Sequence, residues 1–522
     1  MKKKTKITIV TAAVIVLAVL AIFFIINGKE PAVTVPDGAK VGEIILEPEA
    51  YKTDSIDFSA ERGILVVPES RGTDSQRLIA LPITCFKSTA DEPSEPIFYL
   101  SGGPGMSNMD FKPPPELLAN HDVVLVGYRG VDGSVVLDCP NVKQAFKGDG
   151  TDLLGQESLD ALREAFQKDA AQLQVNGIDL DAYTMLDVIA DIEAVRTALG
   201  YEQINLLSLS YGTRIAQIYA YKHPNNIYRS VMIAVNTPGR FVWEPDTIDS
   251  QLEYYSRLYA EALGIDARTQ DLAETMRNVM HDMPSHWLFL PIDAGKVRVT
   301  ANAMLFHRDT ASMVFDAFIA AEQGDPSGLA LMSLAYDFMM PSMFNWGDLA
   351  SKAVSADLDP SRDYSSEMDP PGSIIGAPMS KVVWTAAVWP TAAIPDEYRK
   401  VQVSDVETLL VSGSVDFSTP AEHATNELLP FLNRGQLVLL KEMGHTGDLW
   451  GKQQPAMMRL LTSFYDTGVV DDSLYTYAPM EFSVSMGFPL IAKLALGFMV
   501  VLLLVIALVA WRIVRRIQHR RM

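Results

Sequence analysis

The sequence predicts an α/β fold in which a mostly parallel β-sheet carries helices on both faces. A helical cap insertion interrupts this fold, and an apolar helix flanks it at each end. Three observations support the prediction. A short apolar strand runs into a serine-containing turn and a helix around Ser210, strand patterns return after residue 396, and long uncharged runs lie near both termini. Buried parallel strands are short and apolar, and helices connect them.

The predicted elements follow in order along the chain. Apolar segments separated by turn residues predict strands first, and apolar residues at a spacing of about 3.6 then predict helices. Gly200 is a suitable C-cap before the strand that starts at Ile204, and the next strand follows at 229–235. This order indicates a β-α-β unit with parallel strands. Strands are predicted at 63–68, 78–86, 97–100 and 123–126, and helices at 159–173, 185–199 and 215–222.

The turn after Ile204 has the sequence Ser-Leu-Ser-Tyr-Gly (208–212), which differs by one residue from the G-x-S-x-G nucleophile elbow. Small residues flank the nucleophile in such an elbow because the strand and helix backbones almost touch. The strained backbone of the nucleophile then raises its Oγ above the sheet. Ser210 stands in the nucleophile position, and Ser208 replaces the first glycine. The alternative is a serine-rich turn without chemistry.

Residues 240–395 form the predicted insertion, which is rich in helical patterns and in methionine. Eleven of the chain's 23 methionines lie between Met276 and Met379. Because methionine packs adaptably, the insertion is predicted either to line a variable binding surface or to be ordinary helical core. Strand patterns return at 408–411 and 437–440, with a helix predicted at 421–432.

A serine nucleophile needs a base, a group that orients the base, and donors for the oxyanion. With this type of elbow, the order along the chain is serine, carboxylate, histidine, each after a strand. Asp416 follows the first returning strand and a glycine turn, and His445 follows the second strand and a Met-Gly turn. His423 is a competitor, but it lies in the predicted helix after Asp416. We therefore predict a triad of Ser210, Asp416 and His445.

The oxyanion requires two backbone N–H groups. One is predicted to belong to Tyr211, the residue after the nucleophile, and the other to the Ser-Gly-Gly-Pro-Gly loop at 101–105. Glycine allows a backbone to turn its N–H groups toward a reacting carbonyl. A glycine-rich loop alone is weak evidence, but this loop follows an early strand and precedes a nucleophile elbow.

Five stretches resemble the α/β-hydrolase serine aminopeptidases, a family that includes prolyl iminopeptidase and tripeptidyl aminopeptidase. They are residues 100–105, 122–130, 137–140, 210–214 and 413–420. The resemblance implies an α/β-hydrolase fold with Ser210 as nucleophile, His445 as general base and then acid, and Asp416 orienting the imidazole. It also implies that Gly103 and Tyr211 donate the oxyanion hydrogen bonds. The insertion is only loosely similar.

Two residues depart from the family pattern. Ser208 replaces a glycine, so its hydroxymethyl group must be accommodated, and Gly127 replaces an aspartate, so the turn at 127–130 has lost a carboxylate. In contrast, Ser101 and the Leu-Asp-Cys-Pro segment favour the tripeptidyl type. An aminopeptidase also binds its substrate's ammonium group, normally with carboxylates of the cap. No motif assigns this role among the acidic residues of the insertion, which include Glu244, Asp246, Glu322, Asp325, Asp337, Glu367 and Asp369.

Both ends of the chain carry apolar runs with basic residues on their outer sides. Residues 7–26 have no charge and 490–511 have only Lys493, and each run can span about 30 Å of hydrocarbon. The basic flanks predict two transmembrane helices, two cytoplasmic tails and an extracytoplasmic middle. For the first run the alternative is a cleaved signal peptide, although the run is long and no A-x-A site follows it.

The segment between these runs is strongly acidic. It holds all 64 acidic residues, while ten of the 43 basic residues lie in the terminal segments, and this balance argues against a nucleic-acid partner. Cys85 and Cys139 are too few for a disulfide framework or a structural zinc site. They could form one disulfide outside the cytoplasm, or stay free. We expect no metal and no cofactor, and the oligomeric state is left open.

The patterns together predict a membrane-anchored, extracytoplasmic serine hydrolase. The leading hypothesis is an aminopeptidase, of tripeptidyl or prolyl type, that releases short N-terminal fragments from peptides through an acyl-enzyme. The second is an esterase or lipase-like enzyme acting on acyl esters, and the third is a catalytically silent binding ectodomain. The predicted segments are an anchor (1–27), a tether (28–45), the first part of the core (46–239), the cap (240–395), the second part of the core (396–486) and the second span with its tail (487–522).

Overall fold

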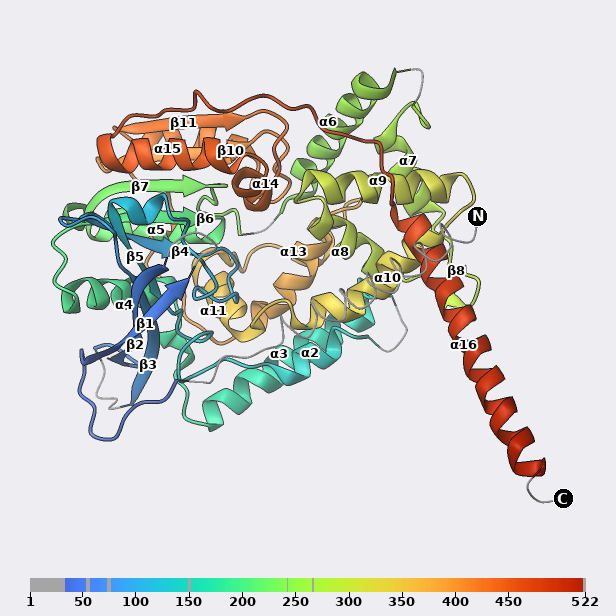
Figure 1. The fold of residues 1–522 in the computed structure, drawn as a ribbon, viewed down its shortest axis with the longest axis horizontal. Coiled ribbons are helices and arrows are strands. Elements are labelled where there is room, and N and C mark those ends of the chain that lie inside the picture. Colours follow the sequence, from blue (N-terminus) through green and yellow to red (C-terminus); the bar gives the residue numbers. More distant parts are fainter. Residues whose placement is uncertain are drawn as a thin grey trace.

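The computed structural model describes residues 33–52, 57–72, 77–148, 152–241, 243–264 and 267–519. Its central element is a nine-stranded sheet with the order β1-β2-β3-β5-β4-β6-β7-β10-β11. Strands from β5 to β11 pair in parallel, whereas β1, β2, β3 and β5 pair antiparallel. Figure 1 shows the sheet at one side of the molecule, the cap helices at the other, and α16 projecting from the cap.

The predicted α/β fold class with a mostly parallel sheet is confirmed. One strand of this sheet was not predicted: β1 lies at the edge of the sheet, where its proline and its glutamates are tolerated because one side of the strand has no partner. The strands are β1 (Ile44–Lys52), β2 (Asp57–Pro68), β3 (Leu78–Phe86), β4 (Ser94–Leu100), β5 (His121–Val126), β6 (Ile204–Leu209), β7 (Ile227–Ile233), β10 (Glu407–Gly413) and β11 (Gly435–Leu440).

Helices cover both faces of the sheet. Helices α4 (Met185–Ala198) and α5 (Tyr211–Lys222) pack on one face, and helix α15 (Gln454–Thr467) packs on the other. Neighbouring residues of one strand therefore enter different cores: Leu206 packs with α4 and α5, and Leu207 with α15. Burial on both faces explains why the central strands read as continuous apolar runs.

The cap is built from helices and one small hairpin. Two helices of the core chain, α2 (Pro140–Ala145) and α3 (Gln156–Val175), pack beneath it. Its elements are α6 (Pro245–Leu263), α7 (Leu272–His281), β8 (His286–Trp287), β9 (Leu290–Pro291), α8 (Ala294–Met304), α9 (Arg308–Glu322), α10 (Ser327–Met339), α11 (Trp346–Asp357), α12 (Tyr364–Glu367) and α13 (Pro378–Val383).

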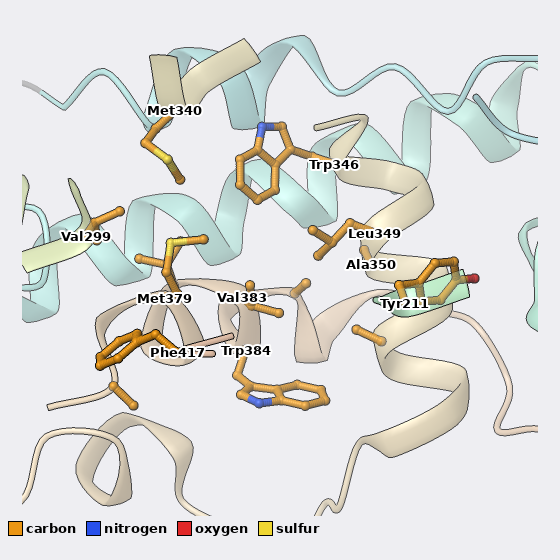
Figure 2. Packing of buried hydrophobic residues seen from close by; sticks show 14 of the residues in the cluster. Tyr211, Val299, Met340, Trp346, Leu349, Ala350, Met379, Val383, Trp384 and Phe417 are labelled. Atoms are coloured by element: carbon orange, nitrogen blue, oxygen red, sulfur yellow. The ribbon is translucent and has the colours of Figure 1, made fainter. Parts of the chain in front are cut away.

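Most cap methionines serve as ordinary core. Figure 2 shows Met340 and Met379 among Val299, Trp346 and Val383, and both methionines are at least 97% buried. Met379 combines the two roles that the sequence left open for the insertion. It is part of the helical core, and it also lines the cavity beside Ser210.

The second half of the core ends in a helix that leaves the body of the protein. The predicted helix at 421–432 is a π-helical turn (His423–Leu428) followed by a 3-10 turn (Leu429–Phe431). After α14 (Thr446–Gly451) and α15, an extended segment at 469–487 crosses to the cap and enters α16 (Phe488–His519).

Within the described ranges, α16 is the helix that is long and apolar enough to cross a membrane. Its candidate span, Phe488–Gln518, has a mean hydropathy of 2.9, and its apolar stretch is not buried in the protein. The other predicted span, 7–26, lies outside the described residues, as do the whole predicted anchor (1–27) and residues 28–32 of the predicted tether. The double-span topology therefore stays a prediction.

Cys85 and Cys139 do not form the disulfide that the sequence left open. Both are free thiols buried in the structure, Cys85 in β3 and Cys139 directly before α2. Burial raises the pKa of the Cys85 thiol to about 12 and also raises that of Cys139. Such thiols are poor nucleophiles at neutral pH.

A buried ion pair joins the core to the cap. The guanidinium of Arg214 in α5 donates to Asp357 at the end of α11 over 2.7 Å, and also to the carbonyl of Thr237. Both side chains are almost completely buried. Because two buried charges compensate each other only when both are present, this pair makes the position of α11 depend on α5.

Removal of Arg214 should expose this dependence. Arg214→Met leaves Asp357 buried without its counter-ion, and we expect the free energy of unfolding in detergent to fall by about 3–5 kcal/mol. Arg214→Met combined with Asp357→Leu should recover part of the loss. Arg277→Met, which breaks an exposed pair with Glu274, is the control and should cost less than about 1 kcal/mol. Equal losses in Arg214→Met and the control would contradict the prediction.

Candidate active site

Ser210 occupies a strained turn between β6 and α5. Its backbone has φ 51° and ψ −122°, a combination that non-glycine residues rarely adopt. The neighbouring Gly212 explains the strain: a Cβ at this position would lie 2.2 Å from the carbonyl oxygen of Leu100 in β4. The helix can approach the sheet this closely only with glycine at 212, and the turn then lifts Ser210 above the strand ends.

Ser208 fits where the elbow usually has glycine. Its side chain is completely buried, and its Oγ donates a 3.0 Å hydrogen bond to the carbonyl of Val231 in β7. The extra hydroxyl is therefore satisfied by the neighbouring strand and points away from the nucleophile's partners.

The structure brings Ser210, His445 and Asp416 into one chain of hydrogen bonds. The Nε2 atom of His445 lies 3.0 Å from Ser210 Oγ, and its Nδ1 lies 2.9 and 3.0 Å from the two Asp416 oxygens. Asp416 is completely buried and also accepts from the amides of Ser418 and Thr419 and from the Thr419 hydroxyl. These donors hold the carboxylate in the orientation that its bond to His445 requires.

Two glycines let the loops of Asp416 and His445 meet. A Cβ on Gly413 would lie 2.1 Å from the Met443 carbonyl, and a Cβ on Gly444 would lie 2.6 Å from the Phe306 carbonyl. Phe306 belongs to the cap, and its carbonyl accepts a 2.7 Å hydrogen bond from the amide of His445. The cap thus helps to fix the backbone of the histidine.

Gly103 and Tyr211, the predicted oxyanion donors, line the same cavity as Ser210. Gly103 has φ +117°, which favours glycine, and the preceding Gly102 packs so closely that its Cβ would lie 3.2 Å from Ser210 Cβ. For neither the Gly103 nor the Tyr211 amide does the structure show a hydrogen-bond partner among the residues that it describes. Two such N–H groups beside a serine Oγ can stabilise the negative charge of a tetrahedral intermediate.

Pro82 and Asp132 fill the space beside Gly127. A Cβ on Gly127 would lie 2.5 Å from the Pro82 ring and 2.8 Å from Asp132 Cβ. One oxygen of Asp132 accepts from the amides of Tyr128 and Asn108. Asn108 in turn accepts from the Ser101 amide and donates to two strand carbonyls, which anchors the loop that contains Gly103. Position 127 has no carboxylate, as the sequence shows, but the turn at 127–130 binds the carboxylate of Asp132 through the amide of Tyr128.

A small cavity of about 60 Å³ opens beside Ser210 between core and cap. Its polar lining includes Asn236, whose Oδ1 is buried without a partner, and Arg240, which forms a salt bridge with Glu427. No residue that lines it in the described part of the chain carries a carboxylate. The apolar lining consists of Phe241, Trp243, Phe344, Leu349, Met379 and Val383.

The acidic residues considered for ammonium binding lie elsewhere in the cap. None of the seven lines this cavity. Five of them form salt bridges: Glu244 and Glu367 with Arg362, Asp325 with Lys493, Asp337 with Lys296, and Asp369 with Arg298 and Lys381. Glu322 accepts a hydrogen bond from Thr275, and Asp246 lies in the first turn of α6.

Comparison with known families matches two parts of the chain. The family model for the alpha/beta hydrolase fold matches residues 95–282, and the model for TAP-like protein matches residues 372–475. The first range contains Ser210 and the loop of Gly103, and the second contains Asp416 and His445. The chain belongs to the α/β-hydrolase family.

Curated relatives of this α/β-hydrolase match over part of their length. Tripeptidyl aminopeptidase of Streptomyces lividans is 25% identical over 223 residues, which are 40% of this chain and 41% of the relative. Putative hydrolase YuaR of Escherichia coli K12 is 27% identical over 172 residues, or 31% of this chain and 33% of that protein. A solved meta-cleavage product hydrolase of Pseudomonas fluorescens IP01 covers 75% of this chain and 96% of its own, at 15% identity and a TM-score of 0.36.

The pKa of Asp132 provides a test of its place under this loop. Burial raises the pKa of its carboxyl from 3.8 to about 6. Because the folded-state value lies above the unfolded one, its stabilising contribution is complete below pH 4 and is lost as the pH rises through 6. The difference between the two pKa values corresponds to a loss of at most about 3 kcal/mol in the free energy of unfolding. Asp132→Asn lacks this titration, so we expect the wild type to lose stability relative to the variant between pH 4 and pH 7.

Thermal midpoints of the two proteins in detergent, measured at several pH values, check this prediction. Asp160→Asn changes an exposed carboxylate of α3 and is the control, and its profile should run parallel to that of the wild type. If the Asp132→Asn profile is parallel as well, Asp132 does not titrate in this interval and the prediction fails.

Proposed function

We propose that this protein is a membrane-anchored, extracytoplasmic serine hydrolase. Specifically, we propose an aminopeptidase of the tripeptidyl or prolyl type, which releases short N-terminal fragments from peptides. The observation that carries the proposal is the chain of hydrogen bonds from Asp416 through His445 to Ser210, with Gly103 and Tyr211 lining the cavity beside the serine. The extracytoplasmic location rests on the basic tails and on α16.

The geometry suits acyl transfer. His445 Nε2 accepts the Ser210 proton as Oγ attacks the substrate carbonyl, and Asp416 at Nδ1 holds the required tautomer and stabilises the imidazolium. The two amides stabilise the oxyanion of the tetrahedral intermediate. His445 then gives the proton to the leaving group, and a water molecule activated by the same imidazole hydrolyses the acyl-enzyme.

Support for peptides as substrates comes from the relatives. The TAP-like family model covers the segment with Asp416 and His445, and two matching relatives are named tripeptidyl aminopeptidase. The match to these relatives spans about two fifths of their length, so their activity is transferred here as part of the proposal. The apolar cavity beside Ser210 suits an uncharged side chain next to the scissile bond.

One observation favours a second candidate, an esterase that acts on acyl esters. An aminopeptidase has to compensate its substrate's ammonium group, yet the charged side chain that lines the cavity is the cation Arg240. Its carboxylate partner Glu427 is the acidic group associated with this wall, and it is already neutralised. A neutral or anionic acyl group fits such a wall better than a free amine does.

A fluorophosphonate probe tests the nucleophile. We expect the full-length protein in detergent to be labelled at Ser210, because the Oγ is partly exposed and bonded to His445. Ser210→Ala should abolish labelling and lower hydrolysis by about 10³-fold or more. Ser208→Ala, two residues away, is the matched control and should keep both, since Ser208 Oγ bonds only to the Val231 carbonyl. Folded wild-type protein that resists the probe would contradict both enzyme hypotheses.

A matched substrate panel separates the two candidates. The aminopeptidase hypothesis predicts hydrolysis of tripeptide p-nitroanilides with a free N-terminus, and a loss of about tenfold or more in kcat/KM when that amine is acetylated. Acetylation removes the ion pair between the substrate's ammonium group and the enzyme, and the loss of one such pair in a desolvated site lowers kcat/KM by at least this factor. Preference for acetylated peptides would overturn the aminopeptidase hypothesis. Preference for p-nitrophenyl esters of medium chain length would overturn it in favour of the esterase.

A further inference from the structure

The exposed apolar side chains of the cap are not scattered. In the described ranges of the cap, 243–264 and 267–395, five large apolar side chains are exposed. All five belong to the β8–β9 hairpin or to α10, and together we call them the hairpin patch: Leu288 (66% exposed), Phe289 (64%), Phe338 (62%), Met339 (48%) and Leu334 (41%). Exposed apolar side chains gathered on adjoining elements mark an interaction surface.

The hairpin tip is built against the usual preferences of a turn in water. β8 ends at Trp287 and β9 begins at Leu290, so Leu288 and Phe289 form the two-residue connection. Leu288 has φ +55°, a conformation for which such turns normally use glycine, asparagine or aspartate. In water this turn is unfavourable, because the leucine backbone is strained and both side chains expose apolar surface. The choice of residues is explained if the tip is buried in an apolar environment.

The hairpin patch adjoins the root of α16. Both strands of the hairpin contact α10, and α10 packs along α16. At the start of this packing, a Cβ on Gly328 would lie 3.0 Å from the Pro489 ring, and Lys493 of α16 forms a salt bridge with Asp325. Figure 1 shows the hairpin on the side of the cap from which α16 projects.

The root of α16 is also held rigidly to the core. The segment that leads to it buries Met480 and Phe482. Arg308 of α9 donates to the carbonyls of Ala478 and Pro479 in this segment and to that of Glu442, next to the loop of His445. A helix held in this way does not act as a flexible tether, so the face of the cap that lies beside it has a defined orientation.

We propose that the hairpin patch inserts into the lipid bilayer that α16 enters, at the boundary between headgroups and acyl chains of the nearer leaflet. This inference rests on the membrane anchoring in the proposed function. The patch adjoins the anchor helix through α10. Trp287, a residue type that favours this boundary, directly precedes the uncharged tip of the hairpin. The acidic ectodomain gives no general attraction to anionic lipids, so insertion of apolar side chains is the contact that remains available.

The bilayer contact has a consequence for the active site. Phe306 and Arg308 bind the backbone at and before His445. Phe306 lies just before α9 and Arg308 begins it, and α9 packs against α10, the helix that carries part of the hairpin patch. The cap is therefore supported at two places on the membrane, by α16 and by the hairpin. The cavity beside Ser210 is held at a constant height and tilt above the lipid surface.

Single-cysteine labelling of the full chain tests the proposal. Both native cysteines are buried with raised pKa values, so an introduced cysteine is labelled selectively by an NBD maleimide. The labelled variants are Phe289→Cys for the patch, Val505→Cys within α16, and Leu439→Cys as control. Leu439 is 51% exposed on the edge strand β11, far from α16 in Figure 1. The proteins are reconstituted into phosphatidylcholine vesicles with or without lipids that carry a nitroxide quencher on the acyl chain.

We expect the NBD group at 289 to lose intensity with a shallow quencher and less with a deep one, and the group at 505 to show the opposite order. The group at 439 should lose none. Quenching at 505 without quenching at 289 would overturn the inference and leave the anchor intact. Absence of quenching at both sites in protein that still reacts with fluorophosphonate would overturn the anchor and the inference together, without affecting the hydrolase. Blue-shifted but unquenched emission at 289 would assign the patch to contact between protein copies and equally overturn the inference.

Discussion

The close approach of α5 to β4 is the constraint on which the rest of this structure depends. Gly212 leaves no room for a side chain against the Leu100 carbonyl, and this contact forces the turn that gives Ser210 its φ of 51°. The same contact places Gly102 against the nucleophile, so that the loop with Gly103 and the amide of Tyr211 flank one point in space. A strained backbone persists only where the surrounding structure determines it. Here the two parallel strands beside β6 supply that support.

The cap is part of this support and not a separate cover. The Phe306 carbonyl holds the amide of His445, and Asp348 of α11 accepts from the Gly105 amide in the oxyanion loop. Figure 2 shows Tyr211 beside Ala350 of α11, and both residues belong to the hydrophobic cluster that joins the core to the cap. The histidine and the oxyanion loop are thus each fixed by one cap element. The Arg214–Asp357 pair joins the helix after the nucleophile to the same α11.

In the proposed membrane-anchored hydrolase, these connections relate the chemistry to the membrane. Arg308 donates hydrogen bonds both to the Glu442 carbonyl, next to the His445 loop, and to the Ala478 carbonyl, in the segment that leads to α16. α16 in turn packs on α9 and α10 of the cap. An anchor helix that continues from packed cap helices transmits its orientation to the cavity, whereas a free linker would not. Selection among substrates can therefore depend on how far their cleavable bond lies from the lipid surface.

The sequence by itself determined the α/β class, most strand positions and the three residues that meet at Ser210, because buried strands, glycine turns and the order serine, aspartate, histidine are local patterns. It could not show that Asp132 joins the turn at 127–130 to Asn108, or that Arg240 and not an acidic residue lines the cavity. These facts depend on contacts between segments that lie apart in the sequence. It also missed β1, whose proline and glutamates obscure the alternation. Only the tertiary structure placed the apolar hairpin beside α16, since packing of α10 decides that neighbourhood.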